Sequence, residues 1–272
     1  MTINCRGKLV DLSVPKIMGI LNLTPDSFYD GGKHNTLKNS IKKTHSMIKS
    51  GASFIDIGGQ STRPGGNKIS IKEEENRLFP IVESLLKEFP NTIFSIDTFY
   101  HSIALRCLEM GVSIVNDISG GYYDSKIIKI AGVKKAPYVL TYNEINPLII
   151  DNDVNFKNIV QKALFYFSSK IREGYQNGLN DIIIDPGFGF SKTIEKDYFI
   201  LKNLEFFKML ELPVLIGLSR KSMIYKKLKI SPEKALNGTS ILNSIALLKG
   251  ANILRVHDVI EAKECIDLLQ SL

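Results

Sequence analysis

The chain has 272 residues, of which 44% are hydrophobic and 23% are charged, and its formal net charge at pH 7 is +7. This composition excludes an intrinsically disordered chain, and three widely spaced cysteines exclude a disulfide scaffold. No apolar stretch approaches the length that spans a bilayer. Residues 1–11 include Arg6 and Lys8 but no apolar core of a signal peptide, so we expect a cytoplasmic protein with no membrane partner.

Apolar and helical stretches alternate along the chain. The first ten residues predict a small hairpin, Ile3 to Val10, which turns at Gly7 and is placed to close the bottom of a barrel. Beyond it, stretches with helical periodicity separate continuously apolar runs, a pattern typical of parallel strands covered by helices. These runs start near Ile17, Phe54, Ile93, Ser113, Tyr138, Ile182, Val214 and Ile253.

Eight strands that alternate with helices predict an α/β fold of the (β/α)8 or TIM barrel type. A doubly wound open sheet is the alternative fold, but no G-x-G-x-x-G motif follows the first of these strands. No linker, low-complexity segment or change of composition interrupts the chain, so residues 1–272 are expected to form a single domain.

An oxygen-rich loop, residues 22–32, follows the first barrel strand. Pro25 and the glycines at the end of the loop cannot continue a strand. Asn22 is a candidate ligand for Mg²⁺, provided that the phosphates of a substrate supply most of the other ligands. Residues 26–28 are interpreted as part of a lid over the site.

Polar side chains collect at the carboxyl ends of the predicted strands, which meet at one face of a barrel. Asp97, Asn116 and Asp185 follow three different strands, and together they suit a ligand with N–H donors and ring nitrogens. A single acidic residue such as Asp56 is more typical of a helix cap or a turn, and we interpret it as structural.

Cationic side chains lie at the same strand ends: Arg63, Lys221, Arg255 and His257. Arg255 and His257 alternate on one strand and therefore face the same side, so with Lys221 they predict an anion pocket suited to phosphate. The other lysines are dispersed without a basic run, which indicates a solvated surface and no nucleic-acid partner.

The sequence offers few residues for covalent or transition-metal chemistry. No His/Cys pair has the spacing of a transition-metal site, and no Ser-His-Asp order or nucleophile elbow is present. The set of polar strand ends therefore predicts an enzyme that orients two reactants and stabilises a departing polyphosphate.

Seven motifs, in the same order and over nearly the whole chain, resemble those of the dihydropteroate synthases. The resemblance implies a homodimeric transferase that joins 6-hydroxymethyl-7,8-dihydropterin diphosphate to p-aminobenzoate, giving 7,8-dihydropteroate and pyrophosphate for folate biosynthesis. The motifs are Asn22-Leu-Thr-Pro-Asp-Ser-Phe, Asp56-Ile-Gly-Gly-Gln-Ser-Thr-Arg-Pro-Gly, Ser95-Ile-Asp-Thr, Val115-Asn-Asp-Ile-Ser-Gly-Gly, Asp185-Pro-Gly-Phe-Gly-Phe, Gly217-Leu-Ser-Arg-Lys-Ser and Leu254-Arg-Val-His-Asp-Val.

The same resemblance implies roles for individual residues. Asn22 would bind Mg²⁺, and Lys221, Arg255 and His257 would act catalytically on the departing diphosphate. The pterin diphosphate would be bound by Thr62, Asp97, Asn116, Asp185, Lys221, Arg255 and His257. The p-aminobenzoate would be surrounded by Arg63, Pro64, Phe190 and Ser222.

The chain departs from the family pattern in two places. The family usually carries Met-His-Met after the fifth strand, where this chain has Leu140 to Glu144, and it commonly has Glu where this chain has Gln60. Two other functions are therefore considered: a pterin-binding regulatory paralogue without turnover, and a corrinoid-linked pterin methyltransferase domain. Neither needs a diphosphate pocket such as Lys221 and Arg255 would form.

Overall fold

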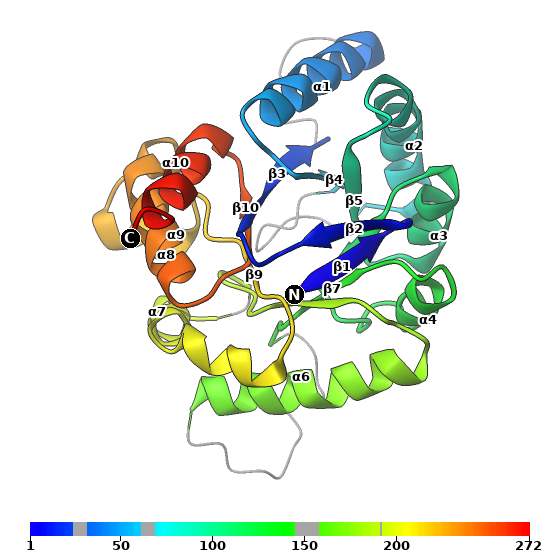
Figure 1. Cartoon of the computed structure of the whole chain (residues 1–272). Coiled ribbons are helices and arrows are strands. Elements are labelled where there is room, and N and C mark those ends of the chain that lie inside the picture. Colours follow the sequence, from blue (N-terminus) through cyan, green and yellow to red (C-terminus); the bar gives the residue numbers. More distant parts are fainter. Residues whose placement is uncertain (24–31, 61–68, 145–157, 191) are drawn as a thin grey trace.

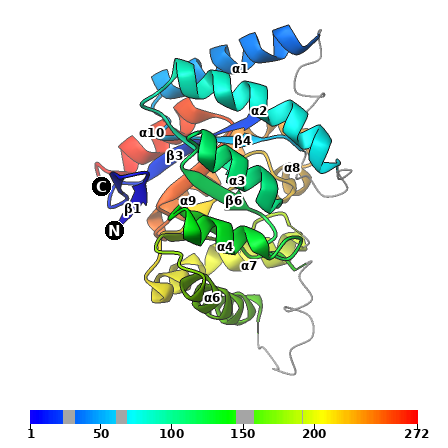
Figure 2. The same cartoon turned by 90° about the vertical axis from the view of Figure 1, so that its right-hand side faces the viewer.

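The structure, a computed structural model, describes residues 1–23, 32–60, 69–144, 158–190 and 192–272. A ring of helices surrounds a cylinder of parallel strands (Figures 1 and 2). The strands of the cylinder are β3 Lys16–Asn22, β4 Phe54–Gly58, β5 Ile93–Asp97, β6 Ile114–Asp117, β7 Tyr138–Thr141, β8 Ile182–Asp185, β9 Leu215–Ile216 and β10 Ile253–Val256. Each of the eight predicted apolar runs therefore forms a strand.

The strands pair in the order β8-β7-β6-β5-β4-β3-β10-β9, and every pair is parallel. An isolated parallel bridge between Ile184 and Val214 connects the two ends of this order. The amide of Ile184 also donates a hydrogen bond to the carbonyl of Pro213, at 2.9 Å. The sheet thus closes into a (β/α)8 barrel, which confirms the predicted fold and excludes the open doubly wound sheet.

The helices follow the strands in alternation, as the periodicity predicted. Ser70 caps α2 by accepting a hydrogen bond from the amide of Glu73, and Gly111 ends α3 with a φ of 128°. No helix among the described residues has the length and the apolar content to cross a bilayer. The helices are α1 Gly32–Lys49, α2 Ile71–Glu88, α3 His101–Met110, α4 Lys126–Val133, α6 Ile159–Gln176, α7 Ile194–Lys202, α8 Ser222–Leu228, α9 Leu236–Leu248 and α10 Val259–Leu269, with short 3-10 helices at η2 Leu204–Leu210 and η3 Pro232–Lys234.

The predicted N-terminal hairpin is also present. Strands β1 Thr2–Cys5 and β2 Lys8–Asp11 pair antiparallel, and Gly7 between them has a φ of 87°, which favours glycine. Ile3 and Val10 pack in one buried cluster with the first inward-facing residues of the barrel strands, Phe54 and Ile114 among them. The hairpin therefore closes the lower end of the barrel, in front of the strands in Figure 1.

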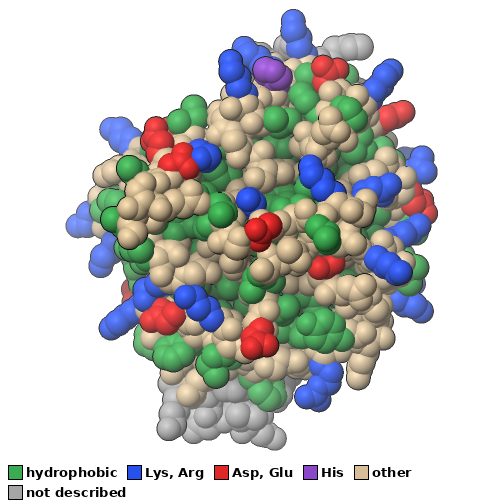
Figure 3. Space-filling model, in the orientation of Figure 1, with side chains coloured by type: hydrophobic (Ala, Val, Ile, Leu, Met, Phe, Trp, Pro, Cys, Tyr) green, Lys and Arg blue, Asp and Glu red, His purple; other side chains and the backbone are tan. Residues whose placement is uncertain are grey.

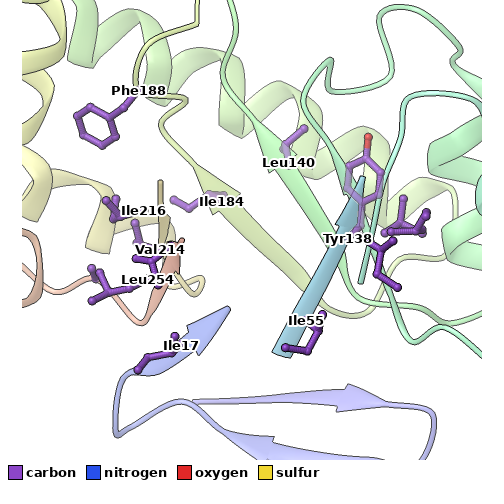
Figure 4. Packing of buried hydrophobic residues seen from close by; sticks show 14 of the residues in the cluster. Ile17, Ile55, Tyr138, Leu140, Ile184, Phe188, Val214, Ile216 and Leu254 are labelled. Atoms are coloured by element: carbon purple, nitrogen blue, oxygen red, sulfur yellow. The ribbon is translucent and has the colours of Figure 1, made fainter. Parts of the chain in front are cut away.

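Successive residues of each strand point alternately inward and outward. Outward residues such as Ile17, Ile55 and Leu254 belong to the large core between the strands and the helices (Figure 4). The lowest inward layer of the barrel consists of Met18, Phe54, Ile93, Ile114, Val139, Ile183, Leu215 and Ile253. Because the side-chain period of a strand is two, the residue two positions after each of these also points inward, one layer higher. These higher positions are Ile20, Asp56, Ser95, Asn116, Thr141, Asp185, Gly217 and Arg255.

Charged side chains are distributed over the molecular surface. On the face shown in Figure 3, Lys and Arg side chains lie around the rim with Asp and Glu side chains among them. This distribution is the one expected for a solvated surface.

Candidate active site

A buried ion cluster lies inside the upper half of the barrel. Arg255 of β10 donates from Nε to Asp56 Oδ2 and from one terminal nitrogen to Asp97 Oδ2, and both distances are 2.6 Å. Asn116 Nδ2 donates to the same Asp56 oxygen at 2.9 Å. The cluster joins strands β10, β4, β5 and β6 across the barrel. The predicted anion-binding arginine therefore bonds directly to the predicted pterin anchor Asp97 and is linked to Asn116 through Asp56.

Two carboxylate oxygens of this cluster remain available to a ligand. Asp56 Oδ1 and Asp97 Oδ1 are buried and have no hydrogen-bond partner among the described residues. Burial raises the pKa of Asp97 to about 7, while the neighbouring Arg255 opposes that rise. Buried acceptors without partners are unfavourable, and a ligand that supplies N–H donors would relieve that cost.

Lys221 lies directly before α8, in the segment that follows β9, the strand paired with β10. Its amine contacts the carbonyl oxygen of Phe188 and lies 4.5 Å from the centre of the Phe190 ring. Burial lowers the pKa of Lys221 to about 8, and the charge of Asp185 opposes the shift. The structure therefore brings Lys221, Asp185 and Phe190 together, as predicted. Ser222 is the first residue of α8.

Arg220, which the sequence analysis did not single out, holds the segment before Lys221. Its backbone has a φ of 54°, in the left-handed region. Its guanidinium makes two hydrogen bonds to Asp258, at 2.8 and 2.9 Å, and its amide donates to Thr239 Oγ1 at 3.1 Å. These contacts connect the β9–α8 segment to α9 and to the start of α10, and thereby fix the position of Lys221.

His257 lies one residue beyond β10, and its Nδ1 is 3.1 Å from Ser219 Oγ. Burial, together with the charge of Arg255, lowers its pKa to about 4. This lowered pKa favours the neutral imidazole at pH 7, so Lys221 and Arg255 supply the charge of the predicted anion pocket. As a neutral imidazole it has one N–H to donate, and it adds no charge to the anion pocket.

Asn22, at the end of β3, is the candidate metal ligand. Its Oδ1 lies 3.5 Å from the place that a Cβ at Gly58 would occupy, and Asp97 Oδ2 lies 3.7 Å from it. No group of three or more His, Cys, Asp or Glu side chains suited to a metal occurs within the described residues. One amide oxygen with few other protein ligands fits Mg²⁺, which keeps several waters and binds through phosphates.

Several predicted residues lie outside the described part of the chain. These are Thr62, Arg63, Pro64 and the lid segment 26–28. Gln60 directly precedes one of these segments, and its Nε2 donates to Glu74 Oε2 of α2 at 3.2 Å. Burial raises the pKa of Glu74 to about 7. Gln60 is thus bonded to a helix that packs against the barrel.

The segment that departs from the family pattern after β7 is well packed. Tyr142 is fully buried, its ring centre lies 5.5 Å from that of Tyr166, and its hydroxyl donates to Glu144 at 3.4 Å. Asn143 donates to the carbonyl of Ile118 at 3.3 Å. The altered sequence therefore packs into the core between the strands and α6 and makes polar contacts of its own.

The interpretation of Asp56 as a cap or turn residue was wrong. Asp56 lies inside β4, fully buried, and accepts hydrogen bonds from Asn116 and Arg255. Its position two residues after the inward Phe54 was the available signal, because that spacing places the carboxylate inside the barrel. A buried acid on the inner face of the barrel needs hydrogen-bond partners inside the barrel, whereas a cap or turn residue bonds to nearby backbone amides instead.

The fold and the mouth together define a (β/α)8-barrel enzyme for a substrate that combines N–H donors with an anionic group. Residues 18–257 match the family model described as pterin binding enzyme. The chain is 37% identical to the dihydropteroate synthase of Escherichia coli strain K12 over 273 residues, which cover 100% of this chain and 96% of that protein.

Solved structures show the same relationship. The dihydropteroate synthase of Yersinia pestis in a sulfonamide complex superposes with a TM-score of 0.90 at 35% identity, covering 100% of this chain and 98% of that one. The enzyme of Xanthomonas albilineans with 4-aminobenzoic acid gives a TM-score of 0.90 at 30% identity, covering 99% and 97%. The chain belongs to the dihydropteroate synthase family, and it is a transferase.

Proposed function

We propose that this chain condenses 6-hydroxymethyl-7,8-dihydropterin diphosphate with p-aminobenzoate, giving 7,8-dihydropteroate and pyrophosphate in folate biosynthesis. The observation that carries the proposal is the buried cluster of Asp56, Asp97, Asn116 and Arg255, with its two unpartnered carboxylate oxygens, at the mouth of a barrel of this family. Residues 1–272 form one domain in this proposal.

The pterin binds within the barrel, against the polar layer. Its amino and ring N–H groups donate to Asp97 and Asp185, Asn116 pairs with the ring edge, and the amine of Lys221 donates to a ring acceptor. Asp185 is already held in place, because its Oδ1 accepts the amide of Gly187 at 2.8 Å. Hydrogen bonds to such buried, ionisable groups are stronger than neutral ones, and they orient the ring system.

The diphosphate lies at the rim, near Lys221, Arg255 and His257, with Thr62 as a further contact. Arg255 already shares its charge with two carboxylates, so the diphosphate needs another counter-ion. A magnesium ion held by Asn22, water and the phosphates fits that need, and when bound it would neutralise charge on the leaving group. His257 donates one neutral N–H to a phosphate oxygen.

The p-aminobenzoate binds beside Phe190 and Ser222, with Arg63 and Pro64 completing its site. The position of the Lys221 amine over the Phe190 ring supports a second site next to the pterin site. A bound ring between these groups would have its amino group directed at the pterin methylene carbon.

The reaction needs positioning and charge stabilisation more than a nucleophile. The bond between the methylene carbon and the diphosphate oxygen breaks, and its electron pair leaves with the diphosphate. The amine of p-aminobenzoate then forms the new carbon–nitrogen bond and loses a proton to solvent. Lys221 and Arg255 stabilise the negative charge that develops on the departing oxygen.

The proposal is tested by measuring pyrophosphate release from the purified protein with pterin diphosphate, p-aminobenzoate and Mg²⁺. We expect Lys221→Ala and Arg255→Ala each to lower kcat/KM by about two orders of magnitude, because each removes a desolvated charge. The control is Lys134→Ala, which changes an exposed lysine and should keep wild-type rates. No release by the wild type would refute the function, and losses below tenfold in both variants would refute the anion pocket.

The protein is further proposed to act in the cytoplasm as a homodimer. Helix α9 supports the dimer, because it is apolar on several sides. Its Ile241, Ile245 and Leu248 are solvent-exposed at helical spacing, and Ile260 and Leu268 are exposed on the adjoining α10. An apolar face of this kind is typical of an interface between subunits.

A further inference from the structure

Lys192 has a partly buried side chain, and among the described residues its amine donates hydrogen bonds to backbone carbonyl groups alone. Its Nζ donates to the oxygens of Tyr142 at 3.2 Å, Gly187 at 2.5 Å and Phe190 at 3.1 Å. A lysine has three donors, so these bonds use its full capacity. The same amine lies 5.0 Å from the centre of the Tyr142 ring.

Two of these carbonyls delimit the turn that follows β8. The amide of Phe190 donates to the carbonyl of Gly187 at 3.2 Å, and Gly187 and Gly189 both have positive φ, at 70° and 75°. Such a tight turn concentrates carbonyl groups on one side, where they repel one another unless a cation lies among them. Lys192 supplies that cation, and burial lowers its pKa to about 8 while Asp197 and Asp185 oppose the shift.

The other side of the same turn carries groups proposed to act on substrate. The carbonyl of Phe188 contacts the amine of Lys221, and the ring of Phe190 lies under that amine. Any change in the turn between Gly187 and Phe190 therefore moves the contacts of Lys221 and the wall of the p-aminobenzoate site.

The third carbonyl belongs to Tyr142, in the segment after β7 where this chain departs from its family. This backbone packs tightly on the turn, because a Cβ at Gly187 would lie 2.0 Å from the Tyr142 oxygen. Lys192 thus ties the β7 and β8 segments together at the point where they form one side of the mouth.

We propose that Lys192 is a positioning residue for the p-aminobenzoate site, acting through the Gly187–Phe190 turn that it holds. This inference rests on the proposed roles of Phe190 and Lys221. Phe190 is bonded to Lys192 through its own carbonyl, whereas the pterin anchors Asp97 and Asn116 belong to other strands. The other two pterin anchors meet the turn at groups that Lys192 does not bond, because Asp185 accepts from the Gly187 amide and Lys221 contacts the Phe188 carbonyl. Loss of the ammonium therefore affects the second substrate more than the first.

The test compares Lys192→Met, which keeps the apolar stem, with Lys196→Met. Lys196 is an exposed lysine in the first turn of α7, paired with Glu144 at 2.8 Å, and serves as the matched control. For each protein we measure kcat, KM for p-aminobenzoate, and Kd for the pterin diphosphate by calorimetry without p-aminobenzoate. The free energy of unfolding is measured alongside.

For Lys192→Met we expect KM for p-aminobenzoate to rise at least tenfold, with Kd for the pterin diphosphate changed less than threefold. Equal losses for both substrates, or a KM within threefold of the wild type, would overturn the inference. If Lys192→Met does not fold, Lys192→Gln is judged by the same two criteria. An inactive wild type would refute the proposed function instead, whereas a fully active Lys192→Met would refute only the inference.

Discussion

Among individual residues, Asp56 connects the two halves of the proposed site. Its Oδ2 accepts from Asn116 on the pterin side and from Arg255 on the diphosphate side. We expect Asp56→Asn to lower kcat/KM at least tenfold, because the amide keeps the shape but removes the charge that orients Arg255. Steady-state kinetics of pyrophosphate release measure this change.

Asp267 offers a matched comparison for Asp56. It is an exposed acid that pairs with Lys263 one turn away on α10, where ion pairs contribute little. Asp267→Asn should keep wild-type kinetics. Rates for Asp56→Asn within threefold of the wild type would return Asp56 to a structural role.

His257 should remain neutral over the whole physiological range, because its pKa is lowered to about 4. In a pH titration followed by NMR, the ring resonances of His257 should not shift between pH 5.5 and 8. The resonances are assigned by their absence from the spectrum of His257→Gln. Since this pKa lies below that of an unfolded histidine, the neutral ring contributes stability above about pH 6.5 that is lost as the pH falls toward 4. A titration midpoint near 6.5 would contradict this.

Among the elements, the N-terminal hairpin is a part of the barrel core. Ile3 is 1% exposed and packs under the strands, whereas Leu9 in the same hairpin is 70% exposed. We expect Ile3→Ala to lower the free energy of unfolding by about 2–4 kcal/mol, and Leu9→Ala to change it by less than about 0.5 kcal/mol. Urea denaturation measures both, and equal effects would show that the hairpin does not close the barrel.

The helices and strands could be predicted from local sequence patterns, whereas the site could be predicted only in part. All eight strands were predictable because each is a short apolar run bounded by polar turns. The partners of Arg255 were not predictable, because Asp56 lies 199 residues away in the chain and their contact depends on barrel closure. Lys192 gave no signal either, since its ligands are backbone carbonyls that any residue provides.

At the scale of the whole molecule, the exposed side of α9 makes the oligomeric state testable. We expect the protein to sediment at twice its 30.4 kDa mass, and Leu248→Lys to shift it to the monomer by placing charge in an apolar interface. Val133 on α4 is as exposed as Leu248, at 66% against 67%, so Val133→Lys is the control. A monomeric wild type, or a dimer unaffected by Leu248→Lys, would contradict the proposed interface.

The strand order of the barrel has a consequence for synthesis on the ribosome. β10, the last barrel strand to be made, lies between β3, the first barrel strand, and β9. Until residue 253 has emerged, β3 and β9 both present unpaired edges, and edges of this kind recruit other strands. A chain arrested before that point is an open sheet without Arg255, so its barrel cannot close and the proposed diphosphate site is incomplete. The nascent protein therefore depends on β10 for protection against aggregation as well as for the proposed activity.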